Sequence, residues 1–207
     1  MTLAQQLAQG AKELGVPLPA AAQEQLLQYL ALLQKWNRVY NLTAVRETQR
    51  MVSEHLLDCL AVTPYIGEKT ILDVGSGAGL PGIPLAVALP AARVTLLDSN
   101  HKKAAFLQQA VSELKLGNVA VACERVESWK PAKRFELAIS RALSDLGEFV
   151  ALAGRHLAPG GRLAAMKGVH PYDEIAQLPE AWPARQVIPL AVPGLRAQRH
   201  LVLLEPA

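Results

Sequence analysis

A glycine-rich segment in the first half of the chain carries the side chains with the clearest chemical meaning. Asp73 is followed by Gly75, Gly77, Gly79 and Gly82, and the last three have the spacing Gly-x-Gly-x-x-Gly. Glycines at such positions let the main chain turn tightly and approach a ligand closely. A carboxylate two residues before the first glycine would repel a pyrophosphate, but it would attract a ligand that carries positive charge.

Three ligand classes and a ligand-free turn compete for this segment. The dinucleotide pattern is matched, but on its own it is a weak signal. The Walker pattern fails because Ile83 stands where the phosphate-binding lysine is needed. S-adenosyl-L-methionine (AdoMet), with a cationic sulfonium and an ammonium group, suits Asp73 best. A strand-to-helix turn that binds nothing is the remaining alternative. It is disfavoured because glycines lose much conformational freedom on folding, and here they would serve no ligand.

Two further acidic positions support a cofactor of this type. Asp98 ends the second predicted strand, where a carboxylate accepts hydrogen bonds from ribose hydroxyls. Its alternative role is to cap the next helix, with Ser99 or Asn100 as competing caps. Val126 and Glu127 follow the third strand and would lie near an adenine ring. Glu127 could equally be a solvated loop acid.

The elements that must hold these residues follow from the hydrophobic pattern. Residues 1–63 predict a helical extension, with helices over 2–14, 20–40 and from Thr48 onward. Residues 64–207 predict an AdoMet-binding domain in which strands alternate with helices, typical of a parallel sheet. The predicted strands are Thr70–Val74, Arg93–Asp98, Val119–Cys123, Phe135–Ser140, Arg162–Met166, Gln186–Val192 and Gln198–Leu204, with a turn at residues 159–161.

The last two strands predict an antiparallel hairpin around Pro193-Gly194. A mostly parallel α/β sheet of seven strands that ends in such a hairpin is the Rossmann-like layout of the class I AdoMet-dependent methyltransferases. Arg141 directly follows the fourth strand, at the sheet edge where ligands bind in open α/β folds. A surface arginine is the alternative for this position.

Composition sets the broad class. The chain has 207 residues, of which 51% are hydrophobic and 19% charged, with a net charge of +3. These values predict a folded protein and exclude a disordered one. Cys59 and Cys123 cannot form a disulfide framework or a four-ligand zinc site, so we expect free buried thiols and no metal. Without a signal peptide pattern or a membrane-length apolar run, we expect a cytoplasmic protein. We also expect a monomer.

Several segments together resemble one protein family over nearly the whole chain. They are WNRVYNLT (36–43), EHLLDCL (54–60), DVGSGAGLPGIP (73–84), LDS (97–99), RVE (125–127), ISRA (139–142), MKG (166–168) and RHL (199–201). The chain resembles the rRNA small-subunit methyltransferase G family, also called glucose-inhibited division protein B. One small departure is Cys59, where relatives often have serine.

The resemblance implies N7 methylation of one guanine in bacterial 16S rRNA, either as naked rRNA or in the small ribosomal subunit or its assembly particle. It also implies AdoMet contacts at Gly75, Leu80, Val126, Glu127 and Arg141. Two other functions stay open from the residues alone. They are a small-molecule methyltransferase on the same fold and a non-catalytic nucleotide-binding protein.

Guanine N7 has a free lone pair and no proton, so we expect no catalytic base. Basic and polar side chains should instead contact RNA phosphates. The candidates are Lys167, Arg199, Arg38 and Asn41, each with a solvated surface group as its alternative. His55 lies on the apolar face of a predicted helix, and we expect it to be a hydrogen-bonded core or interface histidine.

Overall fold

The fold is built on one seven-stranded sheet. A computed structural model describes residues 1–141 and 145–207. The strands are β1 (Thr70–Val74), β2 (Arg93–Leu97), β3 (Val119–Ala122), β4 (Phe135–Arg141), β5 (Leu157–Lys167), β6 (Ala184–Pro189) and β7 (His200–Leu204). Ala142, the last residue of the segment 139–142, lies outside the described residues.

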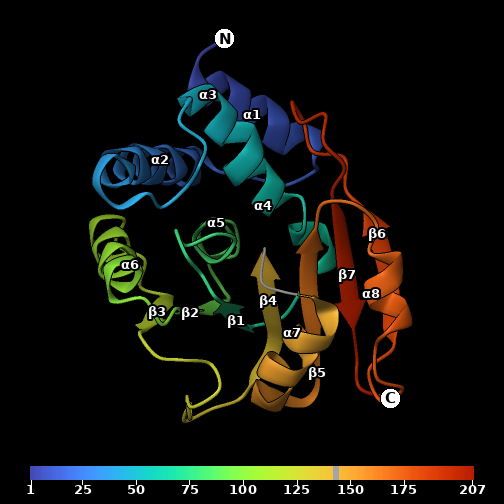
Figure 1. The fold of residues 1–207 in the computed structure, drawn as a ribbon. Coiled ribbons are helices and arrows are strands. Elements are labelled where there is room, and N and C mark those ends of the chain that lie inside the picture. Colours follow the sequence, from blue (N-terminus) through green and yellow to red (C-terminus); the bar gives the residue numbers. More distant parts are fainter. Residues whose placement is uncertain (142–144) are drawn as a thin grey trace.

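The sheet has the order β3-β2-β1-β4-β5-β7-β6 (Figure 1). Strands β1 to β5 pair in parallel, and β7 pairs antiparallel with both β5 and β6. The predicted fold class, a mostly parallel sheet with a C-terminal antiparallel hairpin, is confirmed. The chain runs outward from β1 to β3 and then returns to the other side of β1 with β4. Ligands bind at the carboxyl end of such a reversal in open α/β sheets.

Helices cover both faces of the sheet and one of its ends. They are α1 (Leu3–Glu13), α2 (Ala20–Tyr40), α3 (Thr48–Met51), η1 (Val52–Leu57), α4 (Asp58–Leu60), η2 (Thr63–Tyr65), α5 (Gly82–Ala88), α6 (His101–Glu113), α7 (Leu146–Ala153), η3 (Gly154–His156) and α8 (Tyr172–Ala176). Figure 1 shows α1, α3 and α4 beyond the end of the sheet toward which β4 and β5 point. The N-terminal helices therefore lie over the sheet edge where a ligand is expected.

Local sequence explains where three of the helices, α1, α6 and α7, begin. Thr2 forms a capping box with Gln5 at the start of α1, and the Asn100 side chain accepts hydrogen bonds from two main-chain N–H groups of α6. Asp145 caps α7 by accepting from the Glu148 N–H at 2.8 Å. These caps satisfy the N–H groups that a helix start leaves without partners.

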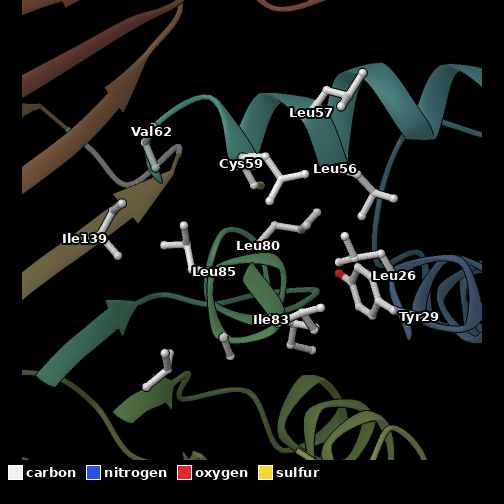
Figure 2. Packing of buried hydrophobic residues seen from close by; sticks show 14 of the residues in the cluster. Leu26, Tyr29, Leu56, Leu57, Cys59, Val62, Leu80, Ile83, Leu85 and Ile139 are labelled. Atoms are coloured by element: carbon white, nitrogen blue, oxygen red, sulfur yellow. The ribbon is translucent and has the colours of Figure 1, made fainter. Parts of the chain in front are cut away.

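The core lies on both faces of the sheet because successive side chains of β1 point to opposite sides. Ile71 packs in the cluster on the α5 face, whereas Leu72 and Val74 pack with α7. Figure 2 shows how the α5 cluster continues into the N-terminal helices, with Leu56 and Tyr29 beside residues of α5 and its preceding loop. The N-terminal helices and the sheet thus share one continuous core.

Three sequence predictions differ from the structure, and one helix was not predicted. The turn predicted at residues 159–161 is an irregular stretch inside β5, with Gly160 at φ +76° and a register shift against β4. The helix α8 was not predicted. The connection between β6 and β7 is longer than Pro193-Gly194 and is closed by a hydrogen bond from Leu190 N to Arg199 O at 2.8 Å. Cys59 is buried as expected, but Cys123 is only partly buried and contacts His101.

Candidate functional site

Two pockets open along the carboxyl edge of the sheet, one on each side of the reversal between β1 and β4. The first has a volume of about 360 Å³ and lies at the ends of β1, β2 and β3. We call it the β1–β3 pocket, and it is lined by Val74, Gly75, Leu97, Asp98, Ser99, Lys103, Glu124, Arg125, Val126, Glu127 and Leu152. It brings together four of the residues predicted to bind a cofactor, which are Gly75, Asp98, Val126 and Glu127.

The glycine loop after β1 is held in a left-handed conformation that favours glycine. Gly75, Gly77 and Gly79 have φ values of +69°, +57° and +88°. The Gly77 N–H donates to Asp98 Oδ2 at 2.8 Å, and Asp98 Oδ1 accepts from Asn100 N at 2.9 Å. Asn100, not Asp98, caps α6, so the Asp98 carboxylate is left to fix the loop and face the pocket.

Asp73 lies beneath this loop and is fully buried. Its Oδ2 accepts from the Gly82 N–H at 2.9 Å, and a side chain at Gly82 would collide with that oxygen and with Leu96. Its Oδ1 has no hydrogen-bond partner within residues 1–141 and 145–207. Burial raises the pKa of Asp73 to about 7, against the hydrogen bond from Gly82. A buried carboxylate of this kind gains a partner when a cationic ligand binds, and the ammonium and sulfonium groups of AdoMet fit that requirement.

The loop after β3 is held from the opposite side of the pocket. The Val126 carbonyl accepts from Arg155 Nη2 at 2.6 Å and lies 3.0 Å from His156 Nε2. Glu127 is an exposed residue that pairs with Arg125 at 3.1 Å. The fixed main chain at Val126 and the neighbouring carboxylate are the features expected of a wall that contacts adenine and ribose.

Helix α2 supports the glycine loop from behind. The Tyr29 hydroxyl is buried and donates to the Ala78 carbonyl at 2.6 Å. Leu80, also predicted to contact the cofactor, is 4% exposed and packs in the same core. The N-terminal helices therefore contribute to the geometry of the β1–β3 pocket even though they do not line it.

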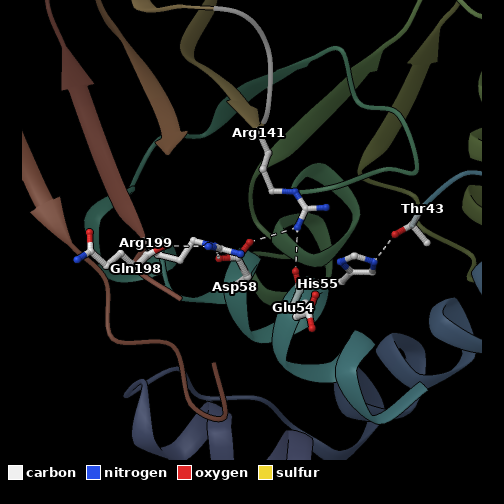
Figure 3. A network of polar contacts seen from close by, with 7 residues as sticks. All are labelled: Thr43, Glu54, His55, Asp58, Arg141, Gln198 and Arg199. Atoms are coloured by element: carbon white, nitrogen blue, oxygen red, sulfur yellow. Dashed lines mark hydrogen bonds and ion pairs between the residues drawn. The ribbon is translucent and has the colours of Figure 1, made fainter. Parts of the chain in front are cut away.

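The second pocket, which we call the β4–β7 pocket, has a volume of about 430 Å³. It is lined by Glu54, His55, Asp58, Arg141, Met166, Lys167, Gly168 and Arg199. Asp58 stands between two arginines, one at the end of β4 and one directly before β7 (Figure 3). Its Oδ2 is 3.2 Å from Arg141 Nη1, and its Oδ1 is 2.9 Å from Arg199 Nε.

This carboxylate joins three elements that are far apart in the sequence. The Asp58 side chain is 3% exposed, and Arg141 also donates to the Glu54 carbonyl at 3.1 Å. Burial raises the pKa of Asp58, and the charges of Arg141 and Arg199 act against this rise. The pair of arginines is thus fixed in position with part of its charge compensated.

His55 is a buried residue of the same pocket, 5% exposed. Its Nε2 lies 2.8 Å from Thr43 Oγ1, and its Nδ1 has no partner in the part of the chain that the structure describes. Burial lowers the pKa of His55 to about 4, helped by the charge of Arg141, so the ring is neutral at pH 7. The prediction of a hydrogen-bonded buried histidine is confirmed.

The predicted RNA contacts have different surroundings. Lys167 pairs with Glu174 at 2.7 Å, and both Lys167 and Arg199 line the β4–β7 pocket. Arg38 is exposed near the end of α2, and Asn41 follows with φ +49° and accepts from Arg46 Nη2 at 2.8 Å. Arg141, predicted to contact the cofactor, lines the β4–β7 pocket and not the β1–β3 pocket.

Sequence reasoning missed Glu54 and Asp58 as pocket residues. Both belong to the segment EHLLDCL, and their separation of four residues puts them on one face of a helix. The π-helical turn Val52–Leu57 interrupts that helix where it borders the pocket. Such turns are frequent at functional sites. The available signal was the pair of acidic residues four positions apart, on the same stretch as the apolar residues Leu56, Leu57 and Leu60.

Comparison with known proteins identifies the family. The family model for rRNA small subunit methyltransferase G matches residues 22–202. The chain belongs to this family. A relative from Laribacter hongkongensis named ribosomal RNA small subunit methyltransferase G is 57% identical over 204 residues, which cover 99% of each chain. Another of the same name, from Nitrosospira multiformis, is 56% identical over 214 residues, covering 100% of this chain and 99% of the relative.

Solved structures confirm the methyltransferase fold expected for the family. The glycopeptide N-methyltransferase MtfA, complexed with AdoMet, matches with a TM-score of 0.61 at 14% identity and covers 74% of this chain and 95% of its own. TrmN from Thermus thermophilus matches with a TM-score of 0.56 at 18% identity, over 83% of this chain and 53% of its own. No helix in residues 1–141 or 145–207 is both long and apolar enough to cross a membrane.

Proposed function

We propose that this protein transfers the methyl group of AdoMet to N7 of one guanine in bacterial 16S rRNA. The observation that carries the proposal is the buried Asp73 carboxylate, whose Oδ1 lacks a partner among the described residues beneath the left-handed glycine loop. That carboxylate needs a cationic ligand, and it stands in a chain that belongs to an rRNA methyltransferase family.

The β1–β3 pocket would hold the cofactor through residues with distinct tasks. Asp73 would attract the cationic end, with Gly75, Gly77 and Gly79 allowing close approach of the main chain. Asp98 would accept hydrogen bonds from the ribose, because its two oxygens keep lone pairs beyond the bonds from Gly77 and Asn100. Leu80, Val126, Glu127 and Arg141 are the remaining proposed cofactor contacts, and Arg141 would act from the border of the two pockets. When bound, AdoMet supplies an activated methyl group on a sulfonium.

The transfer needs positioning more than proton movement. Guanine N7 offers a lone pair and loses no proton, so no side chain has to act as a base. His55 is neutral at pH 7 and is held by Thr43, which fits a role in shaping the pocket. The protein therefore contributes to the rate by aligning the two reactants and excluding water.

Residues 1–63 would form a helical layer over the methyltransferase domain of residues 64–207 and complete its RNA-binding edge. Glu54, His55 and Asp58 belong to this layer and line the β4–β7 pocket. Lys167 and Arg199 at that pocket, with Arg38 and Asn41 near the end of α2, would contact RNA phosphates. The protein would act as a monomer in the cytoplasm, on 16S rRNA or on the small ribosomal subunit.

The test is methyl transfer from labelled AdoMet to three substrates. They are small subunits that lack the modification, the rRNA extracted from them, and a pool of small metabolites. We expect label on N7 of one guanine in 16S rRNA, in one or both rRNA-containing substrates. Label confined to metabolites would favour a small-molecule methyltransferase, and AdoMet-independent binding of NAD without transfer would favour a non-catalytic protein. The variant Asp73→Ala serves as the control for cofactor dependence.

A further inference from the structure

We propose that the β4–β7 pocket receives the target guanine, turned out of the RNA, and that the Glu54 carboxylate reads the N1–H and 2-amino edge of the base. This inference rests on the proposed function. Enzymes that modify a base commonly take it into a pocket and recognise its Watson–Crick edge by hydrogen bonds. The pocket borders Arg141 at the end of β4 and lies on the side of the sheet edge opposite the β1–β3 pocket.

The chemistry of guanine determines which side chains could recognise it. N7 and O6 lie on the edge of the base that must face the methyl group. The other edge presents two donors, N1–H and the 2-amino group, which two carboxylate oxygens can accept together. Adenine carries an acceptor at N1, and a carboxylate would repel it. A carboxylate is therefore the group that favours guanine over adenine at this edge.

The pocket lining contains two carboxylates, and their surroundings differ. Both oxygens of Asp58 are engaged, one by Arg141 and the other by Arg199. Among the residues that the structure describes, Glu54 forms one ion pair, through Oε1 with Arg50 Nε at 2.7 Å, and its side chain is 22% exposed. Its main chain is fixed because the Glu54 carbonyl accepts from Arg141. Glu54 thus combines a fixed position with a carboxylate that can reach an incoming base.

His55 gives independent evidence that a polar ligand enters this pocket. The residue is 5% exposed, lines the pocket, and carries a buried Nδ1 without a partner among the described residues. Figure 3 shows its ring between Thr43 on one side and Arg141 on the other. A buried polar atom without a partner costs free energy that a polar ligand would recover.

The reaction also favours a carboxylate at this place. The N7 lone pair forms the new bond to the methyl carbon, and the electron pair of the broken sulfur–carbon bond stays on sulfur. No proton leaves, so the positive charge moves from the sulfonium to the purine. Glu54 would bind the charged product edge more strongly than the neutral base, which stabilises the charge that develops during transfer.

The experiment combines a side-chain change with a base change. Small subunits are reconstituted with 16S rRNA that carries either guanosine or inosine at the methylated position, because inosine lacks only the 2-amino group. Single-turnover methyl transfer is measured for the wild type, for Glu54→Gln and for the matched control Arg50→Gln. The control removes the ion pair of Glu54 but keeps its carboxylate. AdoMet binding is measured for all three proteins.

We expect Glu54→Gln to slow transfer to guanosine subunits by roughly ten- to a hundredfold, the range for losing a charged hydrogen-bond partner. The wild type should prefer guanosine to inosine, and Glu54→Gln should lose most of that preference. Arg50→Gln should keep the wild-type rate and preference, and AdoMet affinity should stay within twofold throughout.

Two results would overturn the inference alone while the wild type methylates guanosine subunits. One is a wild-type guanosine preference that Glu54→Gln retains in full. The other is an equal loss of rate in Arg50→Gln, which would assign the effect to the ion pair. A wild type that methylates no guanine N7 would instead overturn the proposed function, and this inference with it.

Discussion

The two halves of the sheet edge are built in different ways. The β1–β3 pocket consists of short loops that directly follow three strands, and its main features are main-chain geometry and carboxylates near that main chain. The β4–β7 pocket consists of residues from a helix, from β4, from the end of β5 and its following residue, and from the residue directly before β7. Its central feature is Asp58, which joins Arg141 and Arg199.

We propose that this difference separates binding of the methyl donor from binding of the acceptor base. Short loops after parallel strands make a site that depends on a local motif, which suits a cofactor. The acceptor side depends on the packing of residues 1–63 over the sheet, because that layer supplies Glu54, His55 and Asp58. Changes in one half should therefore affect AdoMet affinity, and changes in the other half should affect transfer to RNA.

The largest effect should follow from Asp58→Asn. Removal of this charge leaves Arg141 and Arg199 close together without a common carboxylate, so both arginines lose the ion pair that fixes them relative to each other. Loss of one partner from a buried ion pair is costly. We expect single-turnover methyl transfer to rRNA to fall by at least about a hundredfold, or roughly 2.7 kcal/mol in activation free energy.

A matched control distinguishes this positioning role from a general loss of stability. Glu68 pairs with Arg162, whose side chain is about as buried as those of Arg141 and Arg199, and the pair lines neither pocket. Glu68→Gln should lower the free energy of unfolding and leave the transfer rate at 25 °C unchanged. Equal losses of transfer in Asp58→Asn and Glu68→Gln would remove the special role of Asp58.

The second effect is a pH dependence confined to the β1–β3 pocket. Asp73 has a pKa of about 7 without ligand, so it is mostly protonated at pH 6 and mostly ionised at pH 8. A cationic ligand binds the ionised form, and AdoMet affinity should rise roughly tenfold between these pH values and then level off. Calorimetry in buffers of different ionisation enthalpy should detect a proton released on binding.

The variant Asp73→Asn provides the comparison for that measurement, because the ligand's own titration is the same with both proteins. The rise in affinity that belongs to Asp73 should be absent in the variant. Identical pH profiles for wild type and Asp73→Asn would show that this carboxylate does not bind the cationic end of the cofactor.

A smaller effect tests the contact that links the N-terminal layer to the β1–β3 pocket. Tyr29→Phe removes the hydrogen bond to the Ala78 carbonyl and leaves that oxygen buried. We expect a loss of about 1–2 kcal/mol in the free energy of unfolding and a several-fold weaker AdoMet affinity. Tyr40 is 43% exposed, and Tyr40→Phe should change neither quantity. Unchanged AdoMet affinity in Tyr29→Phe would show that cofactor binding in the β1–β3 pocket does not depend on this contact from the N-terminal helices.

The smallest effects concern RNA phosphates. Arg199→Ala, Lys167→Ala and Arg38→Ala should each weaken RNA binding without changing AdoMet affinity. Each lost phosphate contact should flatten the plot of log affinity against log salt concentration. The slope should change by about 0.9 where the contact is to a duplex and by about 0.7 where it is to a single strand. RNA affinity measured over a salt series checks this. If the plots of RNA affinity against salt concentration coincide for a variant and the wild type, the substituted residue does not contact RNA phosphates.

The same division explains what the sequence could predict. Asp73 lies near the end of β1, and Gly75 and Asp98 directly follow β1 and β2. Val126 and Glu127 lie in the loop after β3. Hydrophobic pattern and turn chemistry were therefore sufficient to predict that these residues lie at the carboxyl ends of strands. The alternation of strands and helices predicted the mostly parallel sheet, and the turn signal near Pro193-Gly194 predicted the final antiparallel hairpin.

The β4–β7 pocket could not be placed in the same way. Asp58 meets Arg199 across 141 positions of sequence, a contact that no local pattern encodes. Arg141 was predicted from its strand end, but its position in the β4–β7 pocket depends on the Asp58 ion pair. The bulge within β5 was missed because Gly160 has turn chemistry, and pairing with β4 overrides it.

The most direct test of the separation is AdoMet binding by calorimetry, in the absence of RNA, for Asp73→Ala and Asp58→Asn side by side. We predict that Asp73→Ala weakens AdoMet binding by about 1–3 kcal/mol, the usual result of losing a charged hydrogen-bond partner. Asp58→Asn acts on the cofactor only through Arg141, so its AdoMet affinity should fall clearly less than that of Asp73→Ala. Wild-type affinity in Asp73→Ala, or an equal loss in Asp58→Asn, would contradict the assignment of the two pockets to donor and acceptor.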